Sequence, residues 1–269
     1  MDGNNATMQA NRPFYNIRQS FNGFDSQLTF AVEKKVAKVA RVTVSPNQVN
    51  IVENVKHLLS IGYKSIMIAL ATNVPWQKET IDKIYHTLSD FYIETARAGS
   101  ILPLQVTNQL LLAKHEIQHD KYEPPTSGFC GAGKEMLGVS PNGDLYPCHR
   151  FTHSGKEYLL GNVFNGIEHT KREPFLQVTT STLHHEMCNS CLALQYCPGS
   201  CMAANLLDSG DTFYPESRHC LELRAHVYNV DRIYNELIND CPPFISFLTE
   251  AWRSKREKAL MSLLSELSE

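Results

Sequence analysis

The first 129 residues of this 269-residue chain contain no cysteine, whereas eight cysteines follow from Cys130 onward. The absence divides the chain into two parts with different chemistry. Clustered cysteines in a protein that is not exported stay reduced and more often bind metal than form disulfides. The second part is therefore where we look first for a functional site.

The chain also lacks a dominant charge, a long apolar run and a signal sequence. It has 25 Lys and Arg against 28 Asp and Glu, a net charge of −3, which argues against a nucleic-acid-binding surface. No run approaches the ~18 apolar residues of a membrane span. The polar start, residues 1–14, has no signal-peptide pattern. We expect a globular cytoplasmic protein with no nucleic-acid or membrane partner.

The first part has the alternation of an α/β layer. Residues 40–45 and 66–71 are short β-branched or apolar runs typical of strands. Between them, residues 50–61 place apolar side chains at helical spacing, and Gly62 is a stop signal. A further helix is predicted over residues 75–98. This strand, helix, strand order favours a parallel sheet with helices outside it.

Two strands do not make a closed barrel, because an eight-stranded parallel barrel needs ~250 residues. An open parallel sheet also exposes unpaired edges. The first part therefore has the pattern of a portion of a larger α/β structure, and the alternative is a small complete α/β layer.

Several cysteines of the second part lie a few residues apart. Residues 136–146 predict a β-hairpin, because Asn142 and Gly143 tolerate a positive φ, and this hairpin can bring Cys130 near Cys148. The remaining cysteines follow as Cys188-x2-Cys191-x5-Cys197-x3-Cys201 and then Cys220. Such spacings let several sulfurs converge on a metal centre.

Seven thiols exceed one four-ligand centre and fall one short of two. Zinc is the main alternative to iron and sulfur, since His149, His184, His185 or His219 could complete a second zinc site. Cys241, before two prolines, lies outside the pattern and has the setting of a buried thiol.

The seven cysteines together with Gly143 resemble the SPASM motif of radical S-adenosylmethionine enzymes that modify peptides and proteins. Two further segments, residues 147–151 and 160–163, resemble sequences found in thioether-forming maturases. The first part resembles the middle of the radical enzyme barrel at residues 1–3, 12–13 and 41–44. The resemblance implies the second half of a partial (β/α) barrel over residues 1–110. It also implies a small cysteine-rich α+β SPASM domain with a β-hairpin over 111–240, and a C-terminal amphipathic helix over 241–269.

The same resemblance implies two [4Fe-4S] clusters with separate ligand sets. Cys188, Cys191, Cys197 and Cys220 would complete one cluster. Cys130, Cys148 and Cys201 would hold the other, which lacks a fourth cysteine because Met136 stands where some relatives supply one. An open iron could bind a substrate thiolate or relay electrons with another ligand.

Other residues have weaker assignments. His149 follows a cluster cysteine where related sulfatase-maturating enzymes carry an aspartate base, and it either moves a proton or simply packs there. Arg12 and Arg18 occupy the stretch where relatives contact the cofactor, or are solvated surface residues. The apolar stripe from Ile245 to Leu267 marks a helix that packs on the core or binds a partner.

One feature of the family is missing. Radical enzymes hold their catalytic cluster with a CxxxCxxC loop, and no cysteine precedes Cys130. We therefore expect the iron-sulfur portion of a peptide maturase acting on a cysteine-containing peptide. S-adenosylmethionine would bind only a full-length enzyme that has the missing N-terminal barrel half. The alternatives are a non-enzymatic peptide-binding or electron-relay module and a zinc-stabilised structural domain.

Overall fold

The computed structural model describes residues 2–13, 24–36, 38–47, 49–72, 74–126 and 130–266, with side chains described up to residue 258. The chain forms two compact units. Unit 1 comprises Met1–Tyr122 and Ala225–Glu269, and unit 2 comprises Glu123–Arg224. The fold is mixed α/β. None of the helices in the described ranges is both long and apolar enough to cross a membrane.

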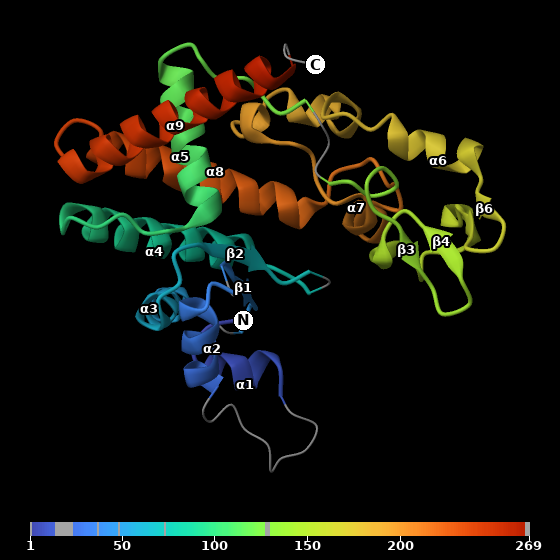
Figure 1. Cartoon of the computed structure of the whole chain (residues 1–269), viewed down its shortest axis with the longest axis horizontal. Helices are drawn as coiled ribbons and strands as arrows, with labels where there is room; N and C mark the ends of the chain where they lie inside the picture. The colour runs from blue at the N-terminus through green and yellow to red at the C-terminus, as the bar shows by residue number, and fades with distance from the viewer. Residues whose placement is uncertain are drawn as a thin grey trace. The chain divides into compact units, whose positions relative to one another are not determined.

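The regular elements are labelled in chain order in Figure 1. The helices are α1 (Asn5–Asn11), α2 (Phe24–Glu33), α3 (Ile51–Ile61), α4 (Lys78–Arg97), α5 (Gln105–Gln118), α6 (His169–Leu176), α7 (Met202–Ser209), α8 (Ser217–Leu237) and α9 (Pro242–Glu266). The strands are β1 (Ala40–Val44), β2 (Ile66–Leu70), β3 (Gly138–Val139), β4 (Asp144–Tyr146), β5 (Gly161–Asn162) and β6 (Gly166–Ile167). Short 3₁₀ helices cover His149–Phe151, Lys156–Tyr158, Ser181–Leu183, Glu186–Cys188 and Leu194–Tyr196.

Unit 1 contains the strand, helix, strand order that the sequence predicts. Strands β1 and β2 pair in parallel from Ala40 with Ile66 to Val44 with Leu70. Helix α3 connects them and ends at Gly62, whose φ of 104° is the left-handed conformation that glycine adopts most readily. Helix α4 begins at Lys78 rather than Pro75, and Trp76 before it donates a hydrogen bond to the Ala71 carbonyl.

The core of unit 1 lies between the strands and the surrounding helices. Val42, Leu58, Ile66, Leu111 and Leu248 are all fully buried. Helix α9 contacts α4 and α5, and α5 crosses both α8 and α9 in Figure 1. The predicted C-terminal helix is therefore present, and Leu248 of its apolar stripe packs on the unit's own core. The stripe's last positions, residues 260–267, lie outside the described side chains.

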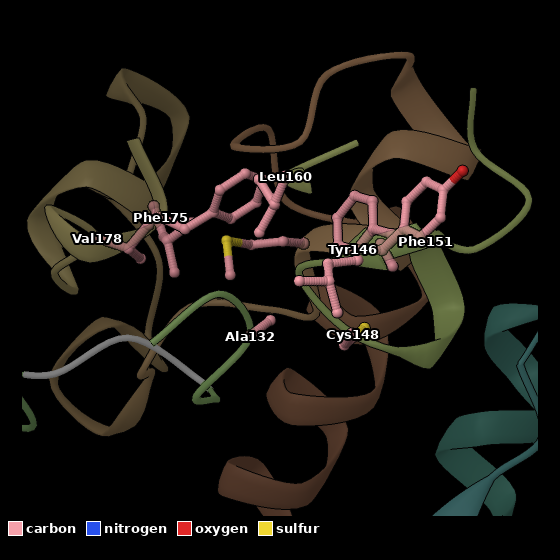
Figure 2. Close-up of a cluster of buried hydrophobic side chains, with 11 residues drawn as sticks. Ala132, Tyr146, Cys148, Phe151, Leu160, Phe175 and Val178 are labelled. Atoms are coloured by element: carbon pink, nitrogen blue, oxygen red, sulfur yellow. The ribbon is translucent and has the colours of Figure 1, made fainter. Parts of the chain in front are cut away.

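Unit 2 has little regular structure. Its sheet orders β3-β4-β5-β6, all antiparallel, and each strand has only two or three residues. The predicted hairpin is β3 and β4, which pair Gly138 with Tyr146. Figure 2 shows the buried cluster of this unit, which includes Tyr146 of β4 together with Cys148, Phe151, Leu160 and Phe175. A cysteine therefore belongs to the core of this unit.

The two compact units follow borders that differ from the segments 1–110, 111–240 and 241–269 proposed from sequence. Helix α9 belongs to unit 1, and the border after Arg224 falls inside α8. The units describe compactness alone, so the functional division of the chain stays a prediction.

Candidate functional site

Three cysteines gather beside the core of unit 2. Cys148 is buried, two residues after the end of β4, while Cys130 and Cys201 are half-buried and pack against the same cluster. Burial raises the pKa of the Cys130 thiol, and the nearby Cys201 and Cys148 thiols raise it further. These electrostatic effects require mutual proximity, so we call Cys130, Cys148 and Cys201 the first thiol group.

Tight backbone packing positions Cys148 and the turn after Cys130. A Cβ atom on Gly138 of β3 would lie 2.5 Å from both the carbonyl carbon and the oxygen of Cys148, so only glycine allows this approach. The Gly133 amide donates to the Pro147 carbonyl at 2.8 Å. This bond ties the turn that follows Cys130 to the residue before Cys148.

The other four pattern cysteines form a second thiol group: Cys188, Cys191, Cys197 and Cys220. They line one cavity of unit 2 together with Leu183, Leu194 and Leu223. Burial raises the pKa of Cys220 to about 11, and the thiols of Cys197, Cys188 and Cys191 add to the increase while Arg224 opposes it. The apolar lining and the mutual proximity of the sulfurs make this an enclosed sulfur-rich site.

Successive turns of the backbone direct this second group inward. The Cys191 amide donates to the Cys188 carbonyl at 2.9 Å, and the Cys197 amide donates to the Leu194 carbonyl at 3.1 Å. Cys220 comes from the first turn of α8. Three cysteines thus lie on short turns, and the fourth comes from a helix that begins twenty residues after Cys197.

Each thiol group contacts one arginine side chain. Arg150 Nη1 lies 3.6 Å from Cys201 Sγ in the first group. Arg224 Nε lies 3.4 Å from Cys191 Sγ in the second. The sequence analysis did not identify either arginine, although Arg150 follows Cys148 by two residues and Arg224 follows Cys220 by one helical turn.

The histidines proposed as alternative zinc ligands lie in varied settings. The Nε2 atom of His184 is 3.1 Å from the Cys197 carbonyl oxygen, and that of His185 is 3.0 Å from the Phe213 carbonyl oxygen. Burial lowers the pKa of His219 to about 4, and Arg218 lowers it further. His149 is exposed in the 3₁₀ helix after Cys148. His219 also makes a hydrogen bond to the Gly199 backbone, so three of the four rings already contact backbone groups.

The residues proposed to bind the cofactor lie in unit 1. Arg12 is exposed, and its guanidinium pairs with the buried Asp2 carboxylate at 2.7 Å. Asp2 also accepts from the Thr43 amide in β1 at 3.3 Å. Arg12 thus helps to fasten the N-terminal residues to the sheet. Arg18 lies outside the described residues.

Cys241 belongs to unit 1. Its thiol is buried and lies 3.5 Å from the Ala96 carbonyl oxygen, to which it donates. This agrees with the sequence interpretation of Cys241 as a small buried thiol. Met136, at the position where a fourth cysteine would stand, is 45% exposed in the turn after Cys130.

The donor chemistry of both groups suits sulfur-ligated iron. Iron-sulfur clusters are held by cysteine thiolates, commonly four to a [4Fe-4S] cluster. The second group supplies four sulfurs and the first supplies three. Across the described ranges, no three Cys, His, Asp or Glu side chains lie close enough to hold a single metal ion.

Residues 130–192 match SPASM, an iron-sulfur cluster-binding domain. This SPASM segment contains Cys130, Cys148, Cys188 and Cys191, and the other three pattern cysteines follow it. The matched segment therefore includes two cysteines of the first thiol group and two of the second. Each group draws part of its cysteines from a segment that resembles an iron-sulfur-binding domain. No curated protein matches the chain significantly.

Solved structures share the fold over 93% of the chain. A histidine-tagged form of anSMEcpe with bound AdoMet has a TM-score of 0.63 and 18% identity, over 93% of this chain and 67% of that chain. Native anSMEcpe with bound AdoMet and Cp18Cys peptide has a TM-score of 0.58 and 18% identity, over 93% and 68%. The corresponding complex with Kp18Cys peptide has a TM-score of 0.58 and 17% identity, with the same coverage. At these identities the likeness concerns the fold.

Proposed function

We propose that this chain is the iron-sulfur-binding portion of a radical S-adenosylmethionine enzyme that modifies a peptide, with two [4Fe-4S] clusters. The observation that carries the proposal is the division of seven thiols into two groups: three lie at one buried core, and four line one cavity. The SPASM match and the fold shared with anSMEcpe, which was solved with bound AdoMet, support it.

The residues that would hold the clusters are those of the two thiol groups. Cys188, Cys191, Cys197 and Cys220 would ligate one cluster completely, and Cys130, Cys148 and Cys201 would supply three ligands to the other. When bound, such clusters accept and pass on single electrons at potentials that the protein sets. The chain has no cysteine before Cys130, so we assign radical generation to none of its residues.

Metal analysis tests this proposal. We expect about eight irons and eight acid-labile sulfides per chain after anaerobic reconstitution, which is the content of two four-iron clusters. Cys148→Ser and Cys197→Ser should each remove the cluster of one group, whereas Cys241→Ser, in unit 1, should leave the iron content unchanged. Zinc without sulfide would replace the proposal with a structural metal domain.

The substrate that we propose is a cysteine-containing peptide whose thiolate completes the first cluster, as in a thioether-forming maturase. Two solved structures with the same fold hold peptides named Cp18Cys and Kp18Cys, which supports a peptide of this kind. The three-cysteine composition of the first group leaves one ligand position for a thiolate, which iron binds readily.

Met136→Cys tests the open position, because it places a thiol in the exposed turn after Cys130. A cysteine-containing peptide should change the electron paramagnetic resonance spectrum of the reduced wild-type protein, and its serine counterpart should not. Met136→Cys should abolish the response. A response to both peptides would show that the peptide binds without its thiol reaching iron.

A further inference from the structure

The arginine at each thiol group has a geometry that directs its charge at sulfur. Arg224 is half-buried on α8, one turn after Cys220, and its Nε donates toward Cys191 Sγ at 3.4 Å. The Cys191 contact raises the pKa of Arg224 most strongly, and the thiols of Cys220 and Cys188 also raise it. Arg224 also lines the cavity that Cys188, Cys191, Cys197 and Cys220 line, so its guanidinium belongs to the second thiol group's site.

The surroundings of Arg224 contrast with those of Arg218, nearly two turns earlier on the same helix. Arg218 is paired with Glu216 at 2.8 Å and Glu222 at 2.6 Å, so carboxylates offset its charge. Within the described ranges, no carboxylate forms an ion pair with Arg224. The charge of Arg224 is therefore available to the sulfurs.

Arg150 repeats this arrangement at the first group by a different route. It lies in the 3₁₀ helix directly after Cys148, and its Nη1 donates toward Cys201 Sγ at 3.6 Å. Arg150 also lowers the pKa of Cys130, which places its charge near a second sulfur of the same group. Two unrelated backbone settings thus deliver the same kind of contact to the two groups.

We propose that Arg150 and Arg224 are positioning residues that each raise the reduction potential of the adjacent cluster, making it easier to reduce. The inference rests on the proposed function, since it needs clusters at both groups. Reduction adds one negative charge to a cluster. A guanidinium stays charged at any physiological pH, and its N–H groups bond more strongly to sulfur that carries more charge. Both effects stabilise the reduced form more than the oxidised form.

A redox titration of the reconstituted full chain tests the inference, with dithionite as reductant and electron paramagnetic resonance as the readout for each cluster. Arg224→Met keeps an unbranched apolar stem but removes the charge and the donors of the guanidinium. We expect at least a tenfold less favourable reduction of the second cluster, which corresponds to about 59 mV for a one-electron couple. The first cluster should be unchanged, and Arg150→Met should give the converse result.

Two variants separate tuning from folding. Arg224→Lys keeps the charge without the fork of donors and should give a smaller decrease in potential. Arg232→Met removes another α8 arginine, which is paired with Asp90 and Glu236 in unit 1, and should change neither potential.

The failures are distinguishable. Full iron and sulfide with unchanged potentials in Arg150→Met and Arg224→Met would overturn the role of the arginines and leave the clusters in place. Loss of the cluster in both Arg224→Met and Arg224→Lys would also overturn it, by showing a structural role alone. Wild-type protein without sulfide would overturn the proposed function, and the inference with it.

Discussion

At the scale of single residues, buried polar groups in unit 1 fix the N-terminal segment. Asn54 of α3 is buried, and its side-chain oxygen accepts hydrogen bonds from the Asn4 amide and the Thr7 hydroxyl. Asn54→Ala leaves both donors without this acceptor, so we expect the free energy of unfolding to fall by roughly 1–3 kcal/mol. Urea unfolding followed by tryptophan fluorescence measures it, because Trp76 and Trp252 both lie in unit 1. Ser60→Ala, at an exposed position, is the matched control. Equal stability of both variants would contradict the buried network.

A buried histidine gives unit 1 a defined pH dependence. Burial lowers the pKa of His226 from 6.5 to about 3, and its Nε2 lies 2.9 Å from the Thr107 hydroxyl. The unfolded chain therefore binds a proton that the folded chain does not between pH 6.5 and 3, and stability falls as the pH falls through this window. From pH 7 to pH 5, wild type should lose about 2 kcal/mol more stability than His226→Gln. His86→Gln, at an exposed histidine, should behave nearly as wild type. Parallel pH profiles for wild type and His226→Gln would show that His226 is not held neutral.

Residue-level prediction of the site had two sources. Cysteine spacing alone indicated a sulfur-rich site, whereas the family resemblance implied which cysteines belong together. Spacing could not supply the grouping, because Cys201 follows Cys197 by four residues yet packs on the same core as Cys130 and Cys148. The arginine contacts depend on pairings 51 and 33 residues apart, which no local pattern encodes. The ion pair of Arg12 with Asp2 was likewise missed, since nothing in the composition of residues 1–13 marks Asp2 as buried.

At the scale of elements, the β3–β4 hairpin is the part of unit 2 that positions a predicted cluster ligand. A methyl group on Gly138 would collide with the Cys148 backbone, so Gly138→Ala should displace Cys148. We expect loss of up to about four irons per chain, the content of one cluster, from the first group alone. Iron and sulfide analysis measures the loss, with the spectrum of the second cluster as an internal reference. Gly166→Asn is the control, because its added side chain meets open space at a positive φ that asparagine tolerates. Retention of all the iron in Gly138→Ala would show that Cys148 is not a ligand, or that β3 shifts enough to accommodate the added methyl group.

Helices and strands were also predicted well from local sequence, whereas their packing against distant elements was not. Periodicity and the Gly62 stop signal predicted β1, α3 and β2 correctly, and Asn142 with Gly143 predicted the hairpin. The packing of α5 against α8 and α9 was not predicted. It is fixed by contacts such as Lys114 with Asp231 and Lys255 with the buried Glu116, whose partners are more than a hundred residues apart.

At the scale of the whole molecule, the two units differ in what holds them together. Unit 1 has helices of up to 25 residues around a large, mainly apolar core. The strands of unit 2 have at most three residues, and the helices that lie wholly within it have at most eight. Elements this short are marginal without tertiary support. The seven pattern cysteines also lie in unit 2, so cluster binding would supply part of its folding free energy.

Removal of iron should therefore unfold unit 2 and spare unit 1. We expect limited proteolysis of chelator-treated protein to cut within residues 123–224, while reconstituted protein resists cleavage there under the same conditions. Tryptophan fluorescence should change little, because both tryptophans report on unit 1. The Cys148→Ser and Cys197→Ser variants should show partial protection, since each keeps one cluster. Equal protection of residues 123–224 with and without iron would mean that the buried apolar side chains around Phe151 and Phe175 suffice to fold unit 2. The metal would then add function without adding stability.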